Sequence, residues 1–158
     1  MILYHGSNIA INSIDLSKSR PNKDFGKAFY LSKERQQAEE MAAFTVDRFG
    51  GLPIVTAFEF DEAALNDKHL KVKLFDGYSR EWAEFIFANR DSDSDDNIHD
   101  FDIVYGPIAN DKVGRQMFNY REGYIDIEEF MRRLNYMKGI TFQYAFCTEL
   151  GISKLKRL

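Results

Sequence analysis

Short strand-like runs outnumber helical runs in this sequence, and the two kinds do not alternate regularly. Apolar runs and period-two alternation predict strands at residues 2–4, 28–31, 53–60, 70–74, 101–105 and 141–147. Helical periodicity predicts three helices, which begin near Ser32, near Ser79 and after Asp126. Strict alternation of strands and helices would indicate a doubly wound parallel sheet. The order found here instead predicts an α+β domain with a split or curved sheet.

The expected helix ends are marked by residues that bond the free backbone N–H and C=O groups there. Ser32 is the expected cap of the first helix, with Glu34 in its first turn, and Gly50 is its expected stop. Asp126 and Glu129 have the spacing of a capping box at the start of the third predicted helix.

The length and composition predict one domain over residues 1–158. The chain is 44% hydrophobic and contains 14 Phe and 8 Tyr, which excludes a disordered chain and favours a core of packed aromatic rings. We find no internal repeat and no linker that would separate a second domain.

Charge and cysteine content narrow the class of protein. The net charge is -4 and there is no long Lys/Arg block, which argues against a general nucleic-acid binder. Cys147 is the only cysteine, so no intramolecular disulfide can form, as expected in a reducing compartment. The sequence has no apolar run long enough for a membrane span and no signal-peptide pattern at its start. We therefore expect a cytoplasmic protein without a membrane partner.

Three short motifs, far apart in the chain, supply a His, a Tyr and a Glu. They are LYHGS at residues 3–7, FGKAFY at 25–30 and QYAFCTE at 143–149. In this order and context the motifs resemble those of the ADP-ribosyltransferase superfamily, most closely its His-Tyr-Glu branch of diphtheria-toxin and poly-ADP-ribose-polymerase type. The whole chain is similar to an uncharacterised bacterial family of that superfamily, and residues 106–112 (GPIANDK) share in the similarity.

The resemblance implies an ADP-ribosyltransferase-like split sheet with flanking helices, and NAD as the substrate. It implies that His5 bonds a ribose hydroxyl of NAD and that Gly6 presents its backbone to the nicotinamide carboxamide. Tyr30 would stack on the nicotinamide ring. Glu149 would stabilise the positive charge that develops on the ribose as nicotinamide leaves, the role of a fixed carboxylate in glycosidases.

The residues expected to contact NAD are His5, Gly6, Ser7, Gly26, Tyr30, Phe44 and Gln143. Each also has a purely structural alternative. His5 would then be an ordinary hydrogen-bonded histidine, Tyr30 a core residue, and the glycines turn formers. Glu149 would be a solvated residue at a strand end. Gln143, six residues before Glu149, either points into the cleft with it or merely caps a turn.

Three positions depart from the resembled pattern. Met41 stands where many members carry a second aromatic ring, and Ala38 where several carry a serine. The pocket would therefore hold NAD less tightly, or use another residue such as Phe44. Cys147, two residues before Glu149, is neither Glu nor Gln, so the sequence carries no indication of the acceptor.

Two weaker signals have simple alternatives. Residues 91–96 resemble the start of a calcium loop, but the sixth and twelfth positions are Asp96 and Asp102 rather than Gly and Glu. We expect a mobile acidic loop and no metal site. Asn110 and Asp111 either line the cleft or cap the next turn.

The leading hypothesis is an NAD-dependent mono-ADP-ribosyltransferase that cleaves the nicotinamide–ribose bond. The acceptor is open: a protein, a nucleic acid or water. With water as acceptor the chain would be an NAD glycohydrolase, acting as a toxin with a cognate antitoxin or immunity partner. The third hypothesis is a catalytically inactive NAD-binding or interaction module, which the departures at Met41 and Ala38 motivate.

Overall fold

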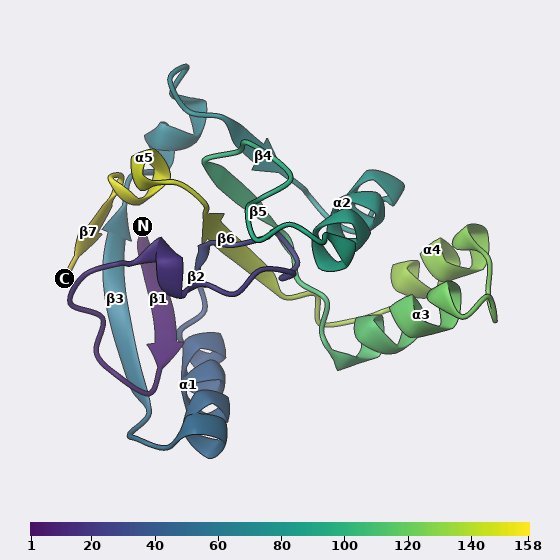
Figure 1. Cartoon of the computed structure of the whole chain (residues 1–158), viewed down its shortest axis with the longest axis horizontal. Coiled ribbons are helices and arrows are strands. Elements are labelled where there is room, and N and C mark those ends of the chain that lie inside the picture. The colour runs from purple at the N-terminus through teal and green to yellow at the C-terminus, as the bar shows by residue number, and fades with distance from the viewer.

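Two β-sheets lie at the centre of the computed structural model, which describes all residues 1–158 (Figure 1). The first sheet has the order β1-β3-β7, and the second has the order β2-β6-β5-β4. All pairings are antiparallel except that of β4 with β5. The strands are β1 (Ile2–Ser7), β2 (Phe29–Leu31), β3 (Ile54–Phe60), β4 (Val72–Leu74), β5 (Ile103–Pro107), β6 (Phe142–Phe146) and β7 (Leu155–Arg157).

Five α-helices accompany the sheets, which confirms the α+β prediction. They are α1 (Arg35–Phe49), α2 (Arg80–Asp91), α3 (Asp111–Arg121), α4 (Ile127–Asn135) and α5 (Glu149–Ile152). In both views α3 and α4 lie side by side, and Figure 1 shows this pair at the end of the molecule away from β7. None of the helices has the length and apolar character needed to cross a lipid bilayer.

The two sheets meet through a single bridge between β1 and the residue after β2. The N–H of Tyr4 donates to the carbonyl of Ser32 at 2.8 Å, and the reverse bond is 2.9 Å. This bridge brings the end of β1, with His5, beside β2. The first and second motifs therefore become neighbours although 25 residues separate His5 from Tyr30.

Alternation along β2 separates two hydrophobic cores. Phe29 and Leu31 join a core between the two sheets, together with Leu3 and Phe146. Tyr30, on the opposite face, packs against a second core that lies under α2, α3 and α4. The pocket-facing residues described below lie where this second face meets β1 and α1.

The close packing of α1 on β1 depends on Gly6. A Cβ atom at this position would lie 1.8 Å from the carbonyl oxygen of Ala38 and 2.8 Å from the backbone nitrogen of Ala42. Ala38 and Ala42 are themselves buried. The missing side chain of Gly6 therefore has a packing role in the helix–strand contact, in addition to any role toward a ligand.

The observed helix ends agree in part with the expected ones. Gly50 ends α1 with φ of 78°, and the side chain of Asp126 accepts from the N–H of Glu129 at the start of α4. Ser32, however, does not cap α1, which begins at Arg35. Its hydroxyl instead accepts from the N–H of Glu34 at 3.0 Å and donates to Gln37 at 2.6 Å.

Three elements were missed from the sequence: α3, α5 and β7. Helix α3 buries only Val113 and Met117, so its apolar stripe is too sparse to indicate a helix. Helix α5 and strand β7 have 4 and 3 residues, shorter than any run in which periodicity is informative. The side chain of Asn110 accepts from the N–H of Val113 at the start of α3. Of the two roles left open for Asn110, lining the cleft or capping the next turn, the structure shows the cap.

Candidate functional site

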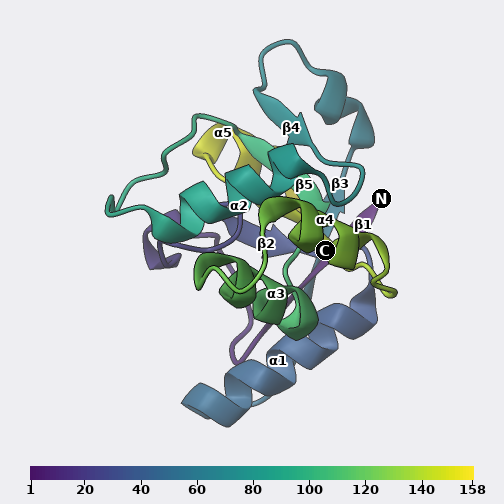
Figure 2. The ribbon, with the colours of Figure 1, turned by 90° about the vertical axis from the view of Figure 1, so that its right-hand side faces the viewer.

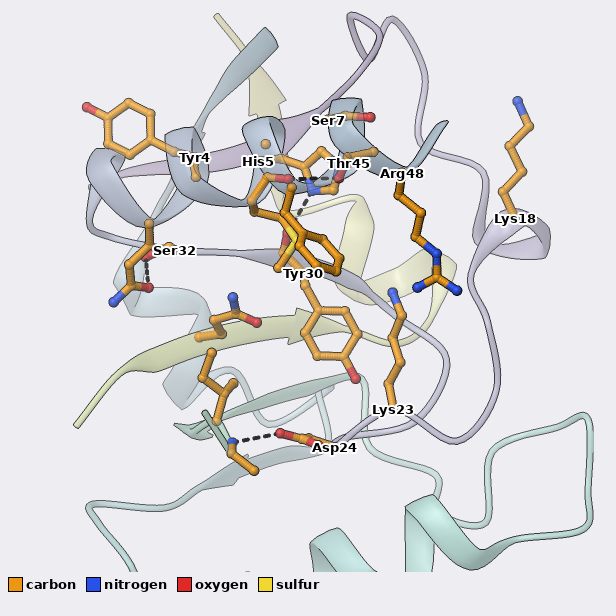
Figure 3. Close-up of a pocket in the computed structure, with 18 of the residues that line it drawn as sticks. Tyr4, His5, Ser7, Lys18, Lys23, Asp24, Tyr30, Ser32, Thr45 and Arg48 are labelled. Atoms are coloured by element: carbon orange, nitrogen blue, oxygen red, sulfur yellow. Dashed lines mark hydrogen bonds between the residues drawn. The ribbon is translucent and has the colours of Figure 1, made fainter. Parts of the chain in front are cut away.

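A pocket of about 880 Å³ lies between β1, α1, the start of β6 and the loop before β2 (Figure 3). Its volume is within the range typical of small-molecule sites. Six of the residues expected to contact NAD line it, namely His5, Gly6, Ser7, Tyr30, Phe44 and Gln143. Gly26 and Glu149 are not among its lining residues.

His5 is held in one orientation at the centre of this pocket. Its Nδ1 atom lies 2.8 Å from the carbonyl oxygen of Tyr30, and its ring stacks on Phe29 with centroids 4.3 Å apart. A carbonyl only accepts, so Nδ1 carries the proton and Nε2 carries the lone pair. Nε2 has no hydrogen-bond partner in the protein. Because every buried side-chain nitrogen and oxygen has a partner, Nε2 must be accessible at the pocket surface. It can accept a hydrogen bond from a ligand hydroxyl.

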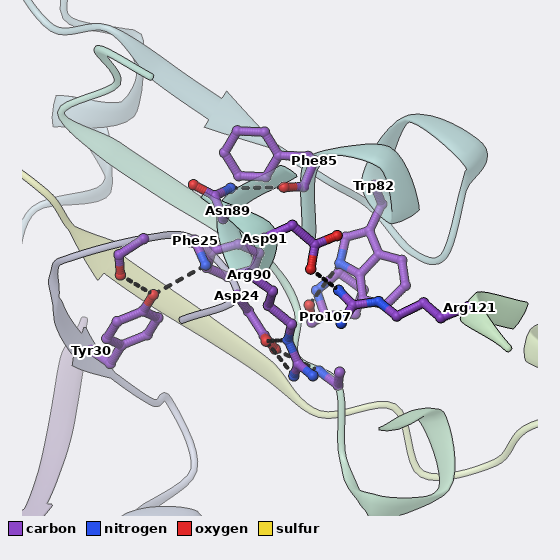
Figure 4. Close-up of polar contacts among 12 residues, drawn as sticks. Asp24, Phe25, Tyr30, Trp82, Phe85, Asn89, Arg90, Asp91, Pro107 and Arg121 are labelled. Carbon is purple, nitrogen blue, oxygen red and sulfur yellow. Dashed lines mark hydrogen bonds and ion pairs between the residues drawn. The ribbon is translucent and has the colours of Figure 1, made fainter. Parts of the chain in front are cut away.

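Tyr30 offers its ring to the pocket, but not its hydroxyl. The hydroxyl donates to the carbonyl of Gly26 at 2.7 Å and accepts from the N–H of Phe25 at 3.1 Å (Figure 4). Burial raises the pKa of Tyr30 well above its usual value, and the nearby Cys147 thiol adds to the effect. The hydroxyl therefore stays neutral and fixed, and the ring face is the part of Tyr30 available for stacking.

Gly26 supports Tyr30 from outside the pocket. Its φ is 84°, and a Cβ there would lie 2.3 Å from the side-chain oxygen of Asn97. That oxygen accepts from the N–H of Lys27 at 2.7 Å. Gly26 thus allows the turn that presents its carbonyl to Tyr30, and it does not line the pocket itself.

Gln143 shares the pocket with His5 and Tyr30 because of the strand register. Tyr30 pairs with Ala145 in β6, and Gln143 lies two residues before Ala145 on the same face of the strand. The side chain of Gln143 makes no hydrogen bond within the protein. Its amide oxygen and nitrogen are therefore free to bind a ligand.

Glu149 lies elsewhere. Strand β6 ends at Phe146, so the alternation that would relate Glu149 to Gln143 does not continue to residue 149. Thr148 instead caps α5, its hydroxyl bonds Asp102 at 2.5 Å, and Glu149 is the exposed first residue of that helix. The structure therefore brings His5, Tyr30 and Gln143 together, and leaves Glu149 apart from them.

Basic side chains dominate the polar part of the pocket. Figure 3 shows Lys23 and Arg48 directed toward the same space beside the Tyr30 ring. The Lys23 ammonium lies 5.0 Å from the centroid of that ring. Burial, and then the charge of Arg20, lower the pKa of Lys23. Two cations that line one pocket, neither of them in an ion pair, form a site suited to a phosphate or another anion.

The loop that carries Lys23 is anchored on both sides. Asp24 accepts from Arg90 at 2.5 Å and from the N–H of Ala109 at 2.8 Å (Figure 4). Asn22 donates to the carbonyls of Arg90 and Ser92 at the end of α2, at 3.1 and 2.6 Å. These bonds fix the chain on both sides of Lys23, and they do not involve its side chain. Sequence reasoning missed Lys23, Asp24 and Arg48, although the first two directly precede the second motif.

Helix α1 forms the apolar wall. Met41 and Phe44 both line the pocket and are 45% and 60% exposed. They lie on the same side of the helix as Arg48, which is four residues after Phe44. An apolar side chain and a ring therefore line the same pocket as Tyr30.

Comparison with known proteins gives one family. A model of the family described as "Protein of unknown function (DUF3990)" matches residues 1–157. The chain belongs to the DUF3990 family. No curated protein and no solved structure matches the chain. The DUF3990 match covers the three motifs and every residue of the pocket.

The environment of His5 predicts a pH dependence of stability. Burial lowers the pKa of His5 below 6.5, the Tyr30 carbonyl opposes this, and Lys23 adds to it. The unfolded chain then binds the proton more readily, so the free energy of unfolding should fall as the pH drops through 6.5. Urea unfolding across this range should show a smaller fall for His5→Gln than for wild type. His69→Gln, at an exposed position outside the pocket, should behave as wild type.

Proposed function

We propose that the pocket binds NAD and that the protein transfers ADP-ribose from it, as an ADP-ribosyltransferase of the His-Tyr-Glu type with Gln143 in the third position. The observation that carries the proposal is the meeting of His5, Tyr30 and Gln143 in one pocket with a cationic end. The two-sheet α+β core is compatible with the split sheet of that superfamily. A cytoplasmic location, where NAD is available, is part of the proposal.

The nicotinamide riboside would lie against His5 and Tyr30. A ribose hydroxyl would donate to Nε2 of His5, which has no partner in the protein. The nicotinamide ring would stack on Tyr30, with Met41 and Phe44 on the other side. Lys23 now covers the Tyr30 ring at 5.0 Å, so it would have to move as the ring enters. Lys23 would then pair with the pyrophosphate of NAD, which would lie next to Arg48.

Gln143 would act on the ribose through its amide oxygen. Breaking the nicotinamide–ribose bond builds positive charge on the ribose, and an oriented carbonyl dipole stabilises that charge. A neutral amide does this less well than a carboxylate. We therefore expect turnover slower than that of an enzyme with Glu in this place.

The proposal is tested by following NAD labelled in either half. Wild-type protein should release labelled nicotinamide, and His5→Ala should do so at least about tenfold more slowly, because a bond to the ribose is lost. His69→Ala is the matched control and should match wild type. Release at the same rate from His5→Ala and wild type would contradict the proposal. Label from the adenylate half appearing as free ADP-ribose, with none on a macromolecule, would identify water as the acceptor.

A second function is favoured because the pocket has no free carboxylate. Asp24 is the only carboxylate among the lining residues, and it is paired with Arg90. No free negative charge is thus available to stabilise a cationic ribose, which favours an NAD-binding module without transfer. Calorimetric binding of NAD, without release of nicotinamide over long incubation, would establish this second function.

A further inference from the structure

The basic residues that form no ion pair are unevenly distributed along this acidic protein. Of its 21 Lys and Arg side chains, 11 form ion pairs, which leaves ten without one. Five of those ten lie in the loop before β2 or at the end of α1. They are Lys18, Arg20, Lys23, Lys27 and Arg48. Three of the five, Lys18, Lys23 and Arg48, line the pocket, although the chain as a whole is negative.

Exposed aromatic rings accompany these cations. Phe49 is 57% exposed, and the guanidinium groups of Arg20 and Arg48 lie 5.3 and 5.4 Å from its centroid. Phe44, one turn earlier, is 60% exposed and lines the pocket. We call Arg20, Phe44, Arg48 and Phe49 the α1 rim. Asp47 is the only acidic residue in the last turn of α1.

We propose that the α1 rim binds a single-stranded nucleic acid and presents it to the pocket as the acceptor of ADP-ribose. An unstacked base would replace the Arg20 guanidinium over the ring of Phe49, and Arg20 would then contact a neighbouring phosphate. Phe44 and Arg48, which NAD would occupy, join this surface to the pocket. Exposed aromatic rings next to cations are the means by which proteins hold single strands without reading their sequence. A duplex offers no free base faces, and an acidic peptide would use the cations but not the rings.

The acceptor role rests on the proposed function. In the transfer step, a nucleophilic atom of the strand forms a bond to the ribose carbon as the nicotinamide–ribose bond breaks. The bonding pair leaves with nicotinamide, which becomes neutral, and the proton displaced from the acceptor goes to solvent. The rim is close enough for this step because Phe44 and Arg48 also line the pocket.

Binding is measured first, without NAD, so that it stands apart from the proposed function. Fluorescent single-stranded oligonucleotides, as DNA and as RNA, are titrated with full-length protein, followed by anisotropy. Wild type should bind at least one of them, and the duplex of the same sequence more weakly. Phe49→Ala should weaken binding on the order of tenfold by loss of stacking. Arg20→Gln should lower the slope of log K against log salt by about 0.7, the value for one phosphate contact.

Matched controls lie on α3. Phe118 is also 57% exposed, and Arg115 also forms no ion pair, so Phe118→Ala and Arg115→Gln should bind as wild type. Equal affinity of Phe49→Ala and Phe118→Ala would overturn the proposal, as would displacement of the strand by an equal concentration of polyglutamate. With labelled NAD added, label on the strand supports the acceptor role. Release of nicotinamide without label on a bound strand overturns it, and loss of release alone counts only against the proposed function.

Discussion

Replacing Gln143 with alanine should lower the rate of nicotinamide release from NAD by about 10²-fold, while Glu149→Ala should leave it unchanged. Gln143 lines the pocket with His5 and Tyr30, and Glu149 does not. Removing one polar group that faces the reacting carbon costs this much in other enzymes that stabilise developing charge. The two variants thus separate the residue that the structure favours from the residue that the motif favours.

The substitution Gln143→Glu sharpens this test. It keeps the length of the side chain and adds a negative charge next to the ribose, so the rate should rise above that of wild type. All four proteins should first be compared by thermal melting. Similar melting temperatures are expected, because the side chains of Gln143 and Glu149 make no hydrogen bonds within the protein. Loss of activity in Glu149→Ala with full activity in Gln143→Ala would restore Glu149 as the catalytic residue.

Replacing Gly6 with alanine should lower the free energy of unfolding by about 3–5 kcal/mol, a large effect for a single methyl group. The added Cβ would lie 1.8 Å from the carbonyl oxygen of Ala38, and a backbone atom cannot rotate away as a side chain can. Helix α1 must therefore move off β1. Because α1 also carries Met41, Phe44 and Arg48, the pocket should widen and NAD binding should weaken together with stability.

Gly114 is the control for this prediction. It lies within α3, and a Cβ there would meet nothing within 4 Å. Gly114→Ala should therefore raise the free energy of unfolding by about 0.5–1 kcal/mol, since alanine is the better helix former. Urea unfolding of the two variants measures both effects. A Gly6→Ala protein as stable as wild type would contradict the packing role of Gly6.

Much of the secondary structure could be predicted because its signals are local. The cap at Ser79 and the stop at Gly50 each depend on a few neighbouring residues. The alternation expected in β4 is not observed, because Leu74 is 48% exposed. The elements that were missed depend on distant ones. Strand β7 exists because β3 offers it an edge, with Lys156 opposite Glu59, and its 3 residues carry no pattern of their own.

The candidate site shows the same division. The three motifs by themselves predicted that His5 and Tyr30 belong to one site, and they gave Glu149 as the third residue. Only the tertiary structure showed that Glu149 lies outside the pocket and Gln143 lines it, because the strand ends at Phe146 and its register with β2 puts Gln143 on the same face as Tyr30.

The charge of the site was also decided in three dimensions. The sequence determined a net charge of -4 without any basic block, which indicated nothing about anions. Folding brings Lys23 and Arg48 together from the loop before β2 and the end of α1, because Gly6 lets that helix pack directly on β1. Electrostatic interaction depends on distance in space and on burial, and neither can be read from positions along the chain.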